Sequence, residues 1–164
     1  MIRSSRKHTV VQMVEANPER DVTVVSSHSR ELSSFGWKGS TGNLPAAYLT
    51  GLLFGLRAKS RGDAMAVLDV GVKNPLAGSR VYAALKGVLD GGIAVPHGDE
   101  VLPSEDRIRG EHIASYGALL AKSEEGVYQR RFSQLLSLGI SPEKIPELFD
   151  VTRSRILESF EEKT

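Results

Sequence analysis

Three short clusters of basic and polar residues have the composition of a phosphate-contacting surface. They run from Arg3 to His8, from Ser26 to Arg30, and from Gly36 to Asn43, where the sequence reads GWKGSTGN. Phosphate contacts use Arg and Lys for charge, hydroxyl groups for hydrogen bonds, and Gly where the backbone must approach closely. Trp37 beside Lys38 adds a ring that could stack on an unpaired base or a ribose. All three clusters lie at the ends of expected elements, so they could form one surface.

Each cluster also has a simpler interpretation. The first could be a solvated chain start, and the second a strand end with ordinary turn hydroxyls. The third could be a flexible loop in which Trp37 buries its ring against the core. This Gly-rich run superficially resembles a phosphate loop before a helix. It lacks the Gly-Lys-Ser/Thr pattern, which argues against nucleotide hydrolysis.

The carboxylates and histidines give weaker signals. Asp69 ends an expected strand, where a nuclease could place a metal-binding acid, but a second and third acid are missing from suitable strand ends. The histidines, which are His8, His28, His97 and His112, lack the spacing of metal ligands. Cysteine is absent, which excludes disulfides, thiolate zinc sites and thiol catalysis. We therefore expect no metal site and no catalytic residues.

Length and charge point to a single domain with an uneven surface. A chain of 164 residues is long enough for a real core. The net charge is only +1, but residues 1–97 hold twelve Lys and Arg against seven Asp and Glu, whereas residues 98–164 hold nine against thirteen. This asymmetry suggests that the first part faces an anionic partner. No apolar run is long enough to span a membrane and no secretory signal is visible, so we expect a cytoplasmic protein without membrane contact.

The first half of the chain shows the pattern of an α/β domain. Two β-branched runs, residues 9–14 and 22–25, are separated by Asn17-Pro18 and predict a hairpin. A helix is predicted from Pro45 to near Gly62, because leucines recur at helical spacing between residues 49 and 56. Residues 66–70 predict a short buried strand. Ser79 predicts the start of a second helix that ends at Gly91-Gly92, and residues 93–95 a last strand.

This order of elements predicts a three-layer α/β domain with a mixed sheet over residues 1–100. Residues 101–164 are expected to be a helical C-terminal extension packed on or beside it. Ile113, Tyr116 and Leu120 share one helical stripe, and Ser141-Pro142 opens another helix that turns Ile145, Leu148 and Phe149 inward. The acidic part from about Ser123 is expected to be dispensable for binding an anionic partner, because its carboxylates would repel phosphate.

Six ordered motifs add a more specific signal. They are SSHSREL (26–32), GWKGSTGNLPAAYLTGLLFG (36–55), VLDVG (67–71), GSRVYAALKGVLDGG (78–92), IAVPH (93–97) and LPSEDRIRGEHI (102–113). Together they resemble the archaeal and eukaryotic-type form of large-subunit ribosomal protein eighteen, the 5S rRNA-binding family. The resemblance covers roughly residues 1–120 in collinear order. The later helices fit it more loosely.

The resemblance implies a ribonuclease-H-like three-layer α/β fold without nuclease activity. It implies a structural role that attaches 5S rRNA to the large-subunit rRNA in the central protuberance, beside neighbouring large-subunit ribosomal proteins. It implies no cofactor and no small-molecule substrate. The alternatives are a metal-dependent nuclease of the same fold class and a protein-interaction domain. Carried over residue by residue, the candidate RNA contacts are Arg3, Arg6, Lys7, His8, Ser29, Arg30, Trp37, Lys38, Ser40, Thr41, Ser79 and Arg80, with Arg107 and Arg109 ranked lower.

One feature departs from the family pattern. Members usually carry a long, strongly basic segment ahead of the first strand, whereas this chain begins at Met1-Ile2-Arg3, near the expected end of that strand. We therefore expect the coding frame to continue upstream with residues rich in Lys and Arg. Much of the family's RNA-binding charge would lie in that segment.

Overall fold

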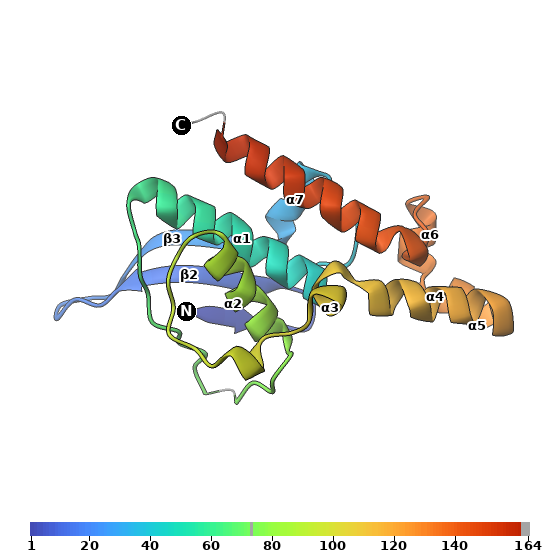
Figure 1. The fold of residues 1–164 in the computed structure, drawn as a ribbon, viewed down its shortest axis with the longest axis horizontal. Coiled ribbons are helices and arrows are strands. Elements are labelled where there is room, and N and C mark those ends of the chain that lie inside the picture. The colour runs from blue at the N-terminus through green and yellow to red at the C-terminus, as the bar shows by residue number, and fades with distance from the viewer. Residues whose placement is uncertain (73, 162–164) are drawn as a thin grey trace.

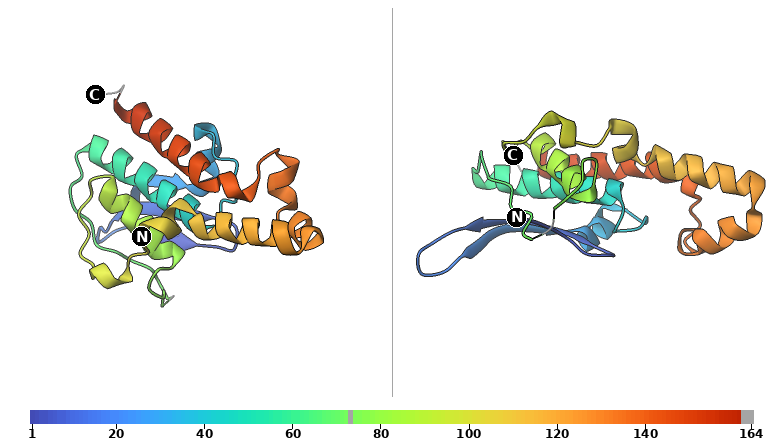
Figure 2. Two further views of the ribbon diagram at one scale, coloured as in Figure 1. Left: turned by 45° about the vertical axis from the view of Figure 1, so that its right-hand side comes forward. Right: turned by 90° about the horizontal axis from the view of Figure 1, so that it is seen from below.

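An antiparallel sheet forms one layer of the molecule, and helices cover one of its faces (Figures 1 and 2). The computed structural model describes residues 1–72 and 74–161. In it, β1 (Ile2–Ser4) pairs with β2 (Thr9–Glu15), and β2 pairs with β3 (Val22–His28). Val10 lies opposite both Arg3 and His28, so the basic ends of β1 and β3 lie on either side of β2. The predicted hairpin is confirmed.

Helices make up most of the remaining described chain. They are the 3-10 helix η1 (Ser29–Phe35), α1 (Leu44–Arg61), α2 (Arg80–Asp90), the 3-10 helix η2 (Asp99–Val101), α3 (Glu105–Arg109), α4 (Glu111–Ser123), α5 (Glu125–Arg131), α6 (Ser133–Ser137), the 3-10 helix η3 (Pro142–Lys144) and α7 (Ile145–Glu161). The side chain of Asn43 caps α1 by accepting a hydrogen bond from the Ala46 N–H at 3.0 Å. Gly62 ends α1 with a φ of 100°. Both helices predicted in the first half are confirmed.

Helices α1 and α2 pack closely through glycines. A Cβ at Gly51 would overlap the Ala84 carbonyl, and one at Gly87 would overlap the Tyr48 carbonyl. Tyr48 contacts Gly87, and one turn or more later along α1 Gly55 contacts Gly91. The contacts advance along both helices together, so the two helices run in the same general direction. Their N-termini therefore lie at the same end of the molecule. The Arg80 guanidinium reaches from the start of α2 to the Gly42 carbonyl at 2.9 Å.

Helix α1 contributes to two apolar clusters. On one side it packs with α2 against the sheet, around Val11, Val25 and Leu85. On the other side Leu49 and Leu53 pack with side chains from the N-terminal and C-terminal parts of the chain, which are Leu32, Trp37, Ile108, Ile145, Phe149 and Ile156. The C-terminal helices thus share a core with α1. A division of the chain near residue 100 stays a prediction, because the second core draws on both sides of it.

The predicted strands at residues 66–70 and 93–95 need correction. The structure assigns no regular strand there; Met65 and Ala94 form an isolated parallel bridge, and the Ile2 N–H donates to the Asp69 carbonyl at 2.9 Å. Val67 is 82% exposed, so the expectation of a buried strand was wrong. Residues 66–70 lie beside β1, and every second side chain of this segment is turned to solvent. The reason is that the helical layer covers only one face of the sheet (Figure 2). The sheet formed by β1, β2 and β3 is therefore antiparallel, whereas the sequence predicted a mixed sheet.

The predicted inward stripe of α4 also holds only in part. Leu120 is buried and Ile113 is half-buried, but Tyr116 is 43% exposed. Helix α4 leads away from the sheet toward α5 (Figure 1), so only a narrow side of it is covered. Within residues 1–72 and 74–161, no helix is both long and apolar enough to cross a membrane.

Candidate nucleic-acid interface

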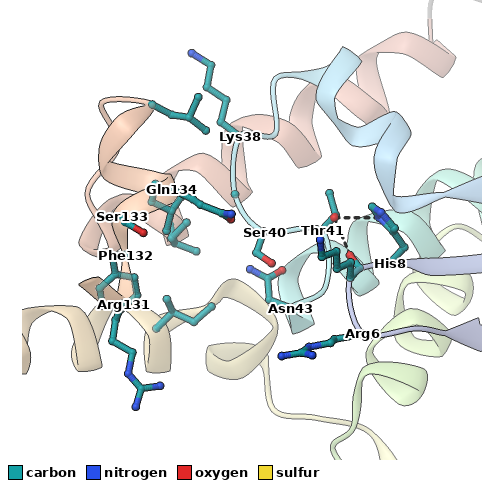
Figure 3. Close-up of a pocket in the computed structure, with 16 residues that line it drawn as sticks. Arg6, His8, Lys38, Ser40, Thr41, Asn43, Arg131, Phe132, Ser133 and Gln134 are labelled. Atoms are coloured by element: carbon teal, nitrogen blue, oxygen red, sulfur yellow. Dashed lines mark hydrogen bonds between the residues drawn. The ribbon is translucent and has the colours of Figure 1, made fainter. Parts of the chain in front are cut away.

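The three basic and polar clusters meet around His8. The imidazole Nδ1 lies 3.1 Å from the Thr41 hydroxyl and 3.4 Å from the Ser29 hydroxyl, and Nε2 lies 3.5 Å from the Arg30 guanidinium. The Thr41 hydroxyl also lies within hydrogen-bond distance of the Lys7 carbonyl, at 2.8 Å. One residue therefore joins the ends of β1 and β3 to the Gly-rich loop. His8 and Thr41 lie side by side at this point (Figure 3), and Ser29 and Arg30 reach His8 from the end of β3.

The environment of His8 favours its neutral form. Burial lowers the pKa of His8, and the positive or titratable neighbours His28, Arg30 and Lys7 lower it further. The His8 and His28 ring centroids are 4.9 Å apart. At neutral pH, His8 therefore acts as a hydrogen-bonding centre rather than as a fixed positive charge. A phosphate placed beside it would favour protonation.

A cleft of about 630 Å³ opens between the Gly-rich loop and helices α5 and α6. Its basic side chains are Arg6, Lys7, Lys38 and Arg131, which we call the rim cations. Asn43 at the start of α1 also lines it, so the positive end of an 18-residue helix lies at its margin. Among the described residues that line this cleft, none is acidic. The cleft therefore presents a uniformly positive rim to an anionic ligand.

Other basic side chains are neutralised inside the fold. Arg3 contacts the Asp69 carboxylate at 2.7 Å, and Arg109 contacts Asp150 at 2.6 Å. The Gly71 N–H and then Arg3 hold the pKa of Asp69 below its usual range. No such ion pair involves a rim cation within the described part of the chain. Arg3 and Arg109 thus differ from the rim cations in both place and charge balance.

Trp37 lies in the core and not on the surface. Its side chain is 3% exposed, and the indole N–H donates to the Ser40 carbonyl at 3.2 Å. Gly39 passes over the ring so closely that a Cβ there would lie 2.6 Å from the indole. Of the two interpretations of Trp37, the ring buried against the core is therefore confirmed, and the ring open to base stacking was wrong. Burial of a large aromatic surface with its N–H satisfied outweighs exposure in a loop.

Several other candidates have structural roles. Ser29 is fully buried and accepts a hydrogen bond from the Thr9 N–H at 3.1 Å. Arg80 holds the Gly-rich loop through the Gly42 carbonyl. Ser79 is the N-cap residue of α2, yet its hydroxyl is buried without a hydrogen-bond partner among the residues described. Arg107 is exposed at the end of α3, near Gly78. Neither Ser79 nor Arg107 lines the cleft.

Comparison with known proteins adds a decisive observation. A family model described as ribosomal large subunit proteins 60S L5 and 50S L18 matches residues 1–65 and 57–98. The chain belongs to this family. The large ribosomal subunit protein uL18 of Staphylothermus marinus is 47% identical over 163 residues, which cover 99% of this chain and 81% of that protein. The L18 resemblance carried by the six motifs is confirmed.

The L18 motifs do not include all the residues that line the cleft. Arg131, Phe132 and Gln134 line it from the C-terminal part of the chain, and Gln134 projects toward the Gly-rich loop (Figure 3). The sequence did not predict them, because residues 98–164 taken together hold more Asp and Glu than Lys and Arg. The adjacent pair Arg130-Arg131, inside an otherwise acidic stretch, was the available signal.

The nuclease alternative gains no support from the carboxylates. Across residues 1–72 and 74–161, no group of three or more His, Asp and Glu side chains is arranged to hold a metal ion. Asp69, the best candidate in the sequence, is bonded to Arg3 and to the Gly71 N–H. An acid held in this way is stabilised as a structural carboxylate.

Proposed function

We propose that this chain is a structural constituent of the large ribosomal subunit that binds 5S rRNA. It attaches 5S rRNA to the large-subunit rRNA in the central protuberance, next to other large-subunit ribosomal proteins, and acts in the cytoplasm as part of the ribosome. It has no catalytic role. Membership of the L18 family supports this assignment.

The observation that carries the proposal is the convergence of three separate clusters around His8, two of which line the positive cleft. Arg6, Lys7 and Lys38 contact RNA phosphates there. The hydroxyls of Ser40 and Thr41 and the Arg30 guanidinium lie nearby and add hydrogen-bond donors. Basic side chains that are not paired with a carboxylate of the chain are available to phosphate. Each such contact releases condensed counterions from the RNA. Arg3 and Arg109 rank below them because carboxylates already hold their guanidinium groups.

The fold is a ribonuclease-H-like domain that has no nuclease site. In this arrangement the order across the sheet is β3, β2, β1, residues 66–70 and residues 93–95. The backbone bond between Ile2 and Asp69 and the parallel bridge between Met65 and Ala94 support that order. The last two segments then extend the sheet without regular ladders.

Salt-dependent binding of the full chain to 5S rRNA tests the proposal. We expect affinity to fall as salt rises, with a slope of about −0.7 to −0.9 per phosphate contact. The triple variant Arg6→Gln, Lys7→Gln, Lys38→Gln should weaken binding about 100-fold at physiological salt and reduce the slope by two to three contacts, roughly one for each phosphate-contacting cation removed. The RNA should remain intact throughout.

A matched triple variant provides the control. Arg57→Gln, Arg61→Gln and Lys86→Gln change the net charge equally, but each of these residues pairs with a carboxylate. This variant should bind within about twofold of the unmodified chain, since it removes no phosphate contact. Equal weakening by the two triples, or an affinity that ignores salt, would contradict the proposal. A protein-interaction domain would show neither a salt slope nor a difference between the triples.

A further inference from the structure

We infer that the cleft between the Gly-rich loop and α5–α6 holds one unpaired nucleotide of the bound rRNA. Its base lies on an apolar floor and its flanking phosphates lie on the rim cations. This inference rests on the proposed RNA-binding function and adds a specific subsite to it. It also gives the C-terminal helices a direct part in RNA recognition.

Part of the cleft lining is apolar, and we call this part the floor. A site for phosphate alone would not need it. Ile113, Phe132, Leu135, Leu138 and Ile145 line it. Leu138 is 56% exposed, so a ligand seated there would remove apolar surface from water. Phe132 packs against Tyr116 and Tyr128, with ring centroids 6.2 and 5.6 Å apart, which fixes its position. RNA-binding proteins seat unpaired bases on apolar and aromatic surfaces of this kind.

Polar side chains also line the cleft. Gln134 projects from α6 toward Ser40 and Asn43 on the opposite wall (Figure 3). Amide and hydroxyl groups can form hydrogen bonds with the edge of a base. A volume of about 630 Å³ is within the range of sites that enclose a small organic ligand. The lining therefore fits a nucleotide in size and in chemistry.

The rim cations lie on both sides of the cleft. Lys38 and Arg6 belong to the first half of the chain, and Arg131 lies across from them at the end of α5 (Figure 3). A backbone that crosses the cleft would meet positive charge on entry and on exit. The Tyr128 hydroxyl donates to Glu143 at 3.2 Å and ties α5, the helix that ends at Arg131, to η3.

This subsite opposes the expectation that the acidic part from Ser123 is dispensable. Deletion of that part is not a clean test, because Ile145, Phe149 and Ile156 belong to the second core. Point variants of the full chain are needed. The chain offers matched controls for both the charge and the floor.

The charge test compares Arg131→Gln with Arg130→Gln. Both residues are exposed on α5, but only Arg131 lines the cleft. Arg131→Gln should weaken binding of the full chain to 5S rRNA about 3- to 10-fold and lower the salt slope by roughly one contact. Arg130→Gln should change affinity by less than about twofold, because it removes no cleft contact. Equal effects of the two variants would overturn the inference.

The floor test compares Leu138→Ser with Leu119→Ser. These leucines are 56% and 61% exposed, and only Leu138 lines the cleft. Leu138→Ser should weaken RNA binding about 3- to 10-fold without changing the salt slope, because stacking and apolar contacts are not ionic. Leu119→Ser should bind as the unmodified chain does. Thermal melting of both variants checks that the fold is retained.

The outcomes separate this inference from the proposed function. If the unmodified chain shows no salt-dependent binding to 5S rRNA, the proposed function fails. If it binds but Arg131→Gln and Leu138→Ser have no effect, only the nucleotide subsite fails. If Arg131→Gln weakens binding and Leu138→Ser does not, the cleft holds backbone alone and the base placement is overturned. If both variants bind RNA normally but fail to enter large subunits, the cleft takes a protein segment and the inference is overturned.

Discussion

The rim cations of the cleft and the paired cations elsewhere differ in what surrounds them. Arg57 contacts Glu31, Arg61 contacts Glu15 and Arg109 contacts Asp150, each at 2.6 Å. The rim cations Arg6, Lys7, Lys38 and Arg131 line a cleft in which no described residue is acidic. The chain as a whole carries a net charge of only +1. The position of the carboxylates, and not their number, therefore decides which of the described cations form an ion pair within the chain.

The two groups would respond differently to a phosphate. A paired Arg must weaken its contact with a carboxylate before it binds another anion, so the exchange yields little free energy. A rim cation exchanges only water and loosely held ions, and phosphate contact releases counterions from the RNA. The comparison predicts that substitutions in the two groups alter different measured quantities.

The largest effect should come from Trp37→Ala, beside the rim cation Lys38. The substitution leaves a cavity in the second core and should lower the free energy of unfolding by about 3–5 kcal/mol. Lys38→Ala should leave that free energy within about 0.5 kcal/mol but weaken RNA binding. Denaturant titration and salt-dependent binding of both variants measure this. If Trp37→Ala kept full stability and lost RNA affinity, the ring would be a contact residue and our placement of the RNA surface would fail.

The next effect should come from Asn43→Ala, compared with Ser79→Ala. Asn43 caps α1 through the Ala46 N–H, whereas the Ser79 hydroxyl makes no cap bond to the described part of α2. Asn43→Ala should therefore destabilise the fold by about 1 kcal/mol. Ser79→Ala should cost clearly less, because its buried hydroxyl has no partner to lose. Equal losses of unfolding free energy would mean that both side chains act as caps.

The sequence predicted those parts of the fold that depend on local signals. Pro45 and Gly62 mark the ends of α1, and the Asn17-Pro18 break separates β2 from β3. The meeting of the three basic clusters could also be expected, since each lies at the end of an element. These features follow from capping, turn chemistry and strand order, which depend on residues close in the chain.

The features that the sequence did not predict depend on distant contacts. Burial of Trp37 depends on Gly39, which lies over the ring, and on core residues such as Phe149. Phe149 lies far along the chain, so its contact with this core is not visible in the local sequence. The exposure of Val67 reflects a sheet face that no helix covers. Arg131 joins the cleft only because the chain turns back after α4 and brings α5 and α6 to the Gly-rich loop (Figure 2). The charge summed over residues 98–164 does not reveal a single basic residue such as Arg131.

A smaller effect should follow the charge on His8. The pKa of His8 is lowered by burial and by His28, Arg30 and Lys7. In the free protein, the ring therefore gains its positive charge only at a pH below the usual pKa of an imidazole. RNA affinity should rise a few-fold as pH falls from about 7.5 to 5.5, because phosphate favours the protonated ring. The free fold should lose stability over the same range, since a lowered pKa means that the folded state binds this proton less readily than the unfolded state.

Two variants test whether His8 is responsible. His8→Gln should flatten the pH dependence of RNA binding. His112→Gln should preserve it, because His112 lies outside the cleft and burial, followed by Arg107, lowers its pKa. If His8→Gln kept the full pH dependence, another group such as His28 would carry it.

The smallest effect should come from Arg61→Gln, which removes a paired cation. Arg61 contacts Glu15 at 2.6 Å and Asp63 at 3.3 Å, and its side chain is 43% exposed. Exposed ion pairs of this kind contribute only about 0.2–1 kcal/mol, since water and salt screen them. Arg61→Gln should therefore lower the free energy of unfolding by less than about 1 kcal/mol and leave 5S rRNA affinity and its salt slope unchanged. A double-mutant cycle with Glu15→Gln isolates the pair, and its coupling should shrink at high salt. A drop in RNA affinity as large as that of Lys38→Ala would show that pairing does not withhold a cation from RNA, and the contrast between the two groups would then fail.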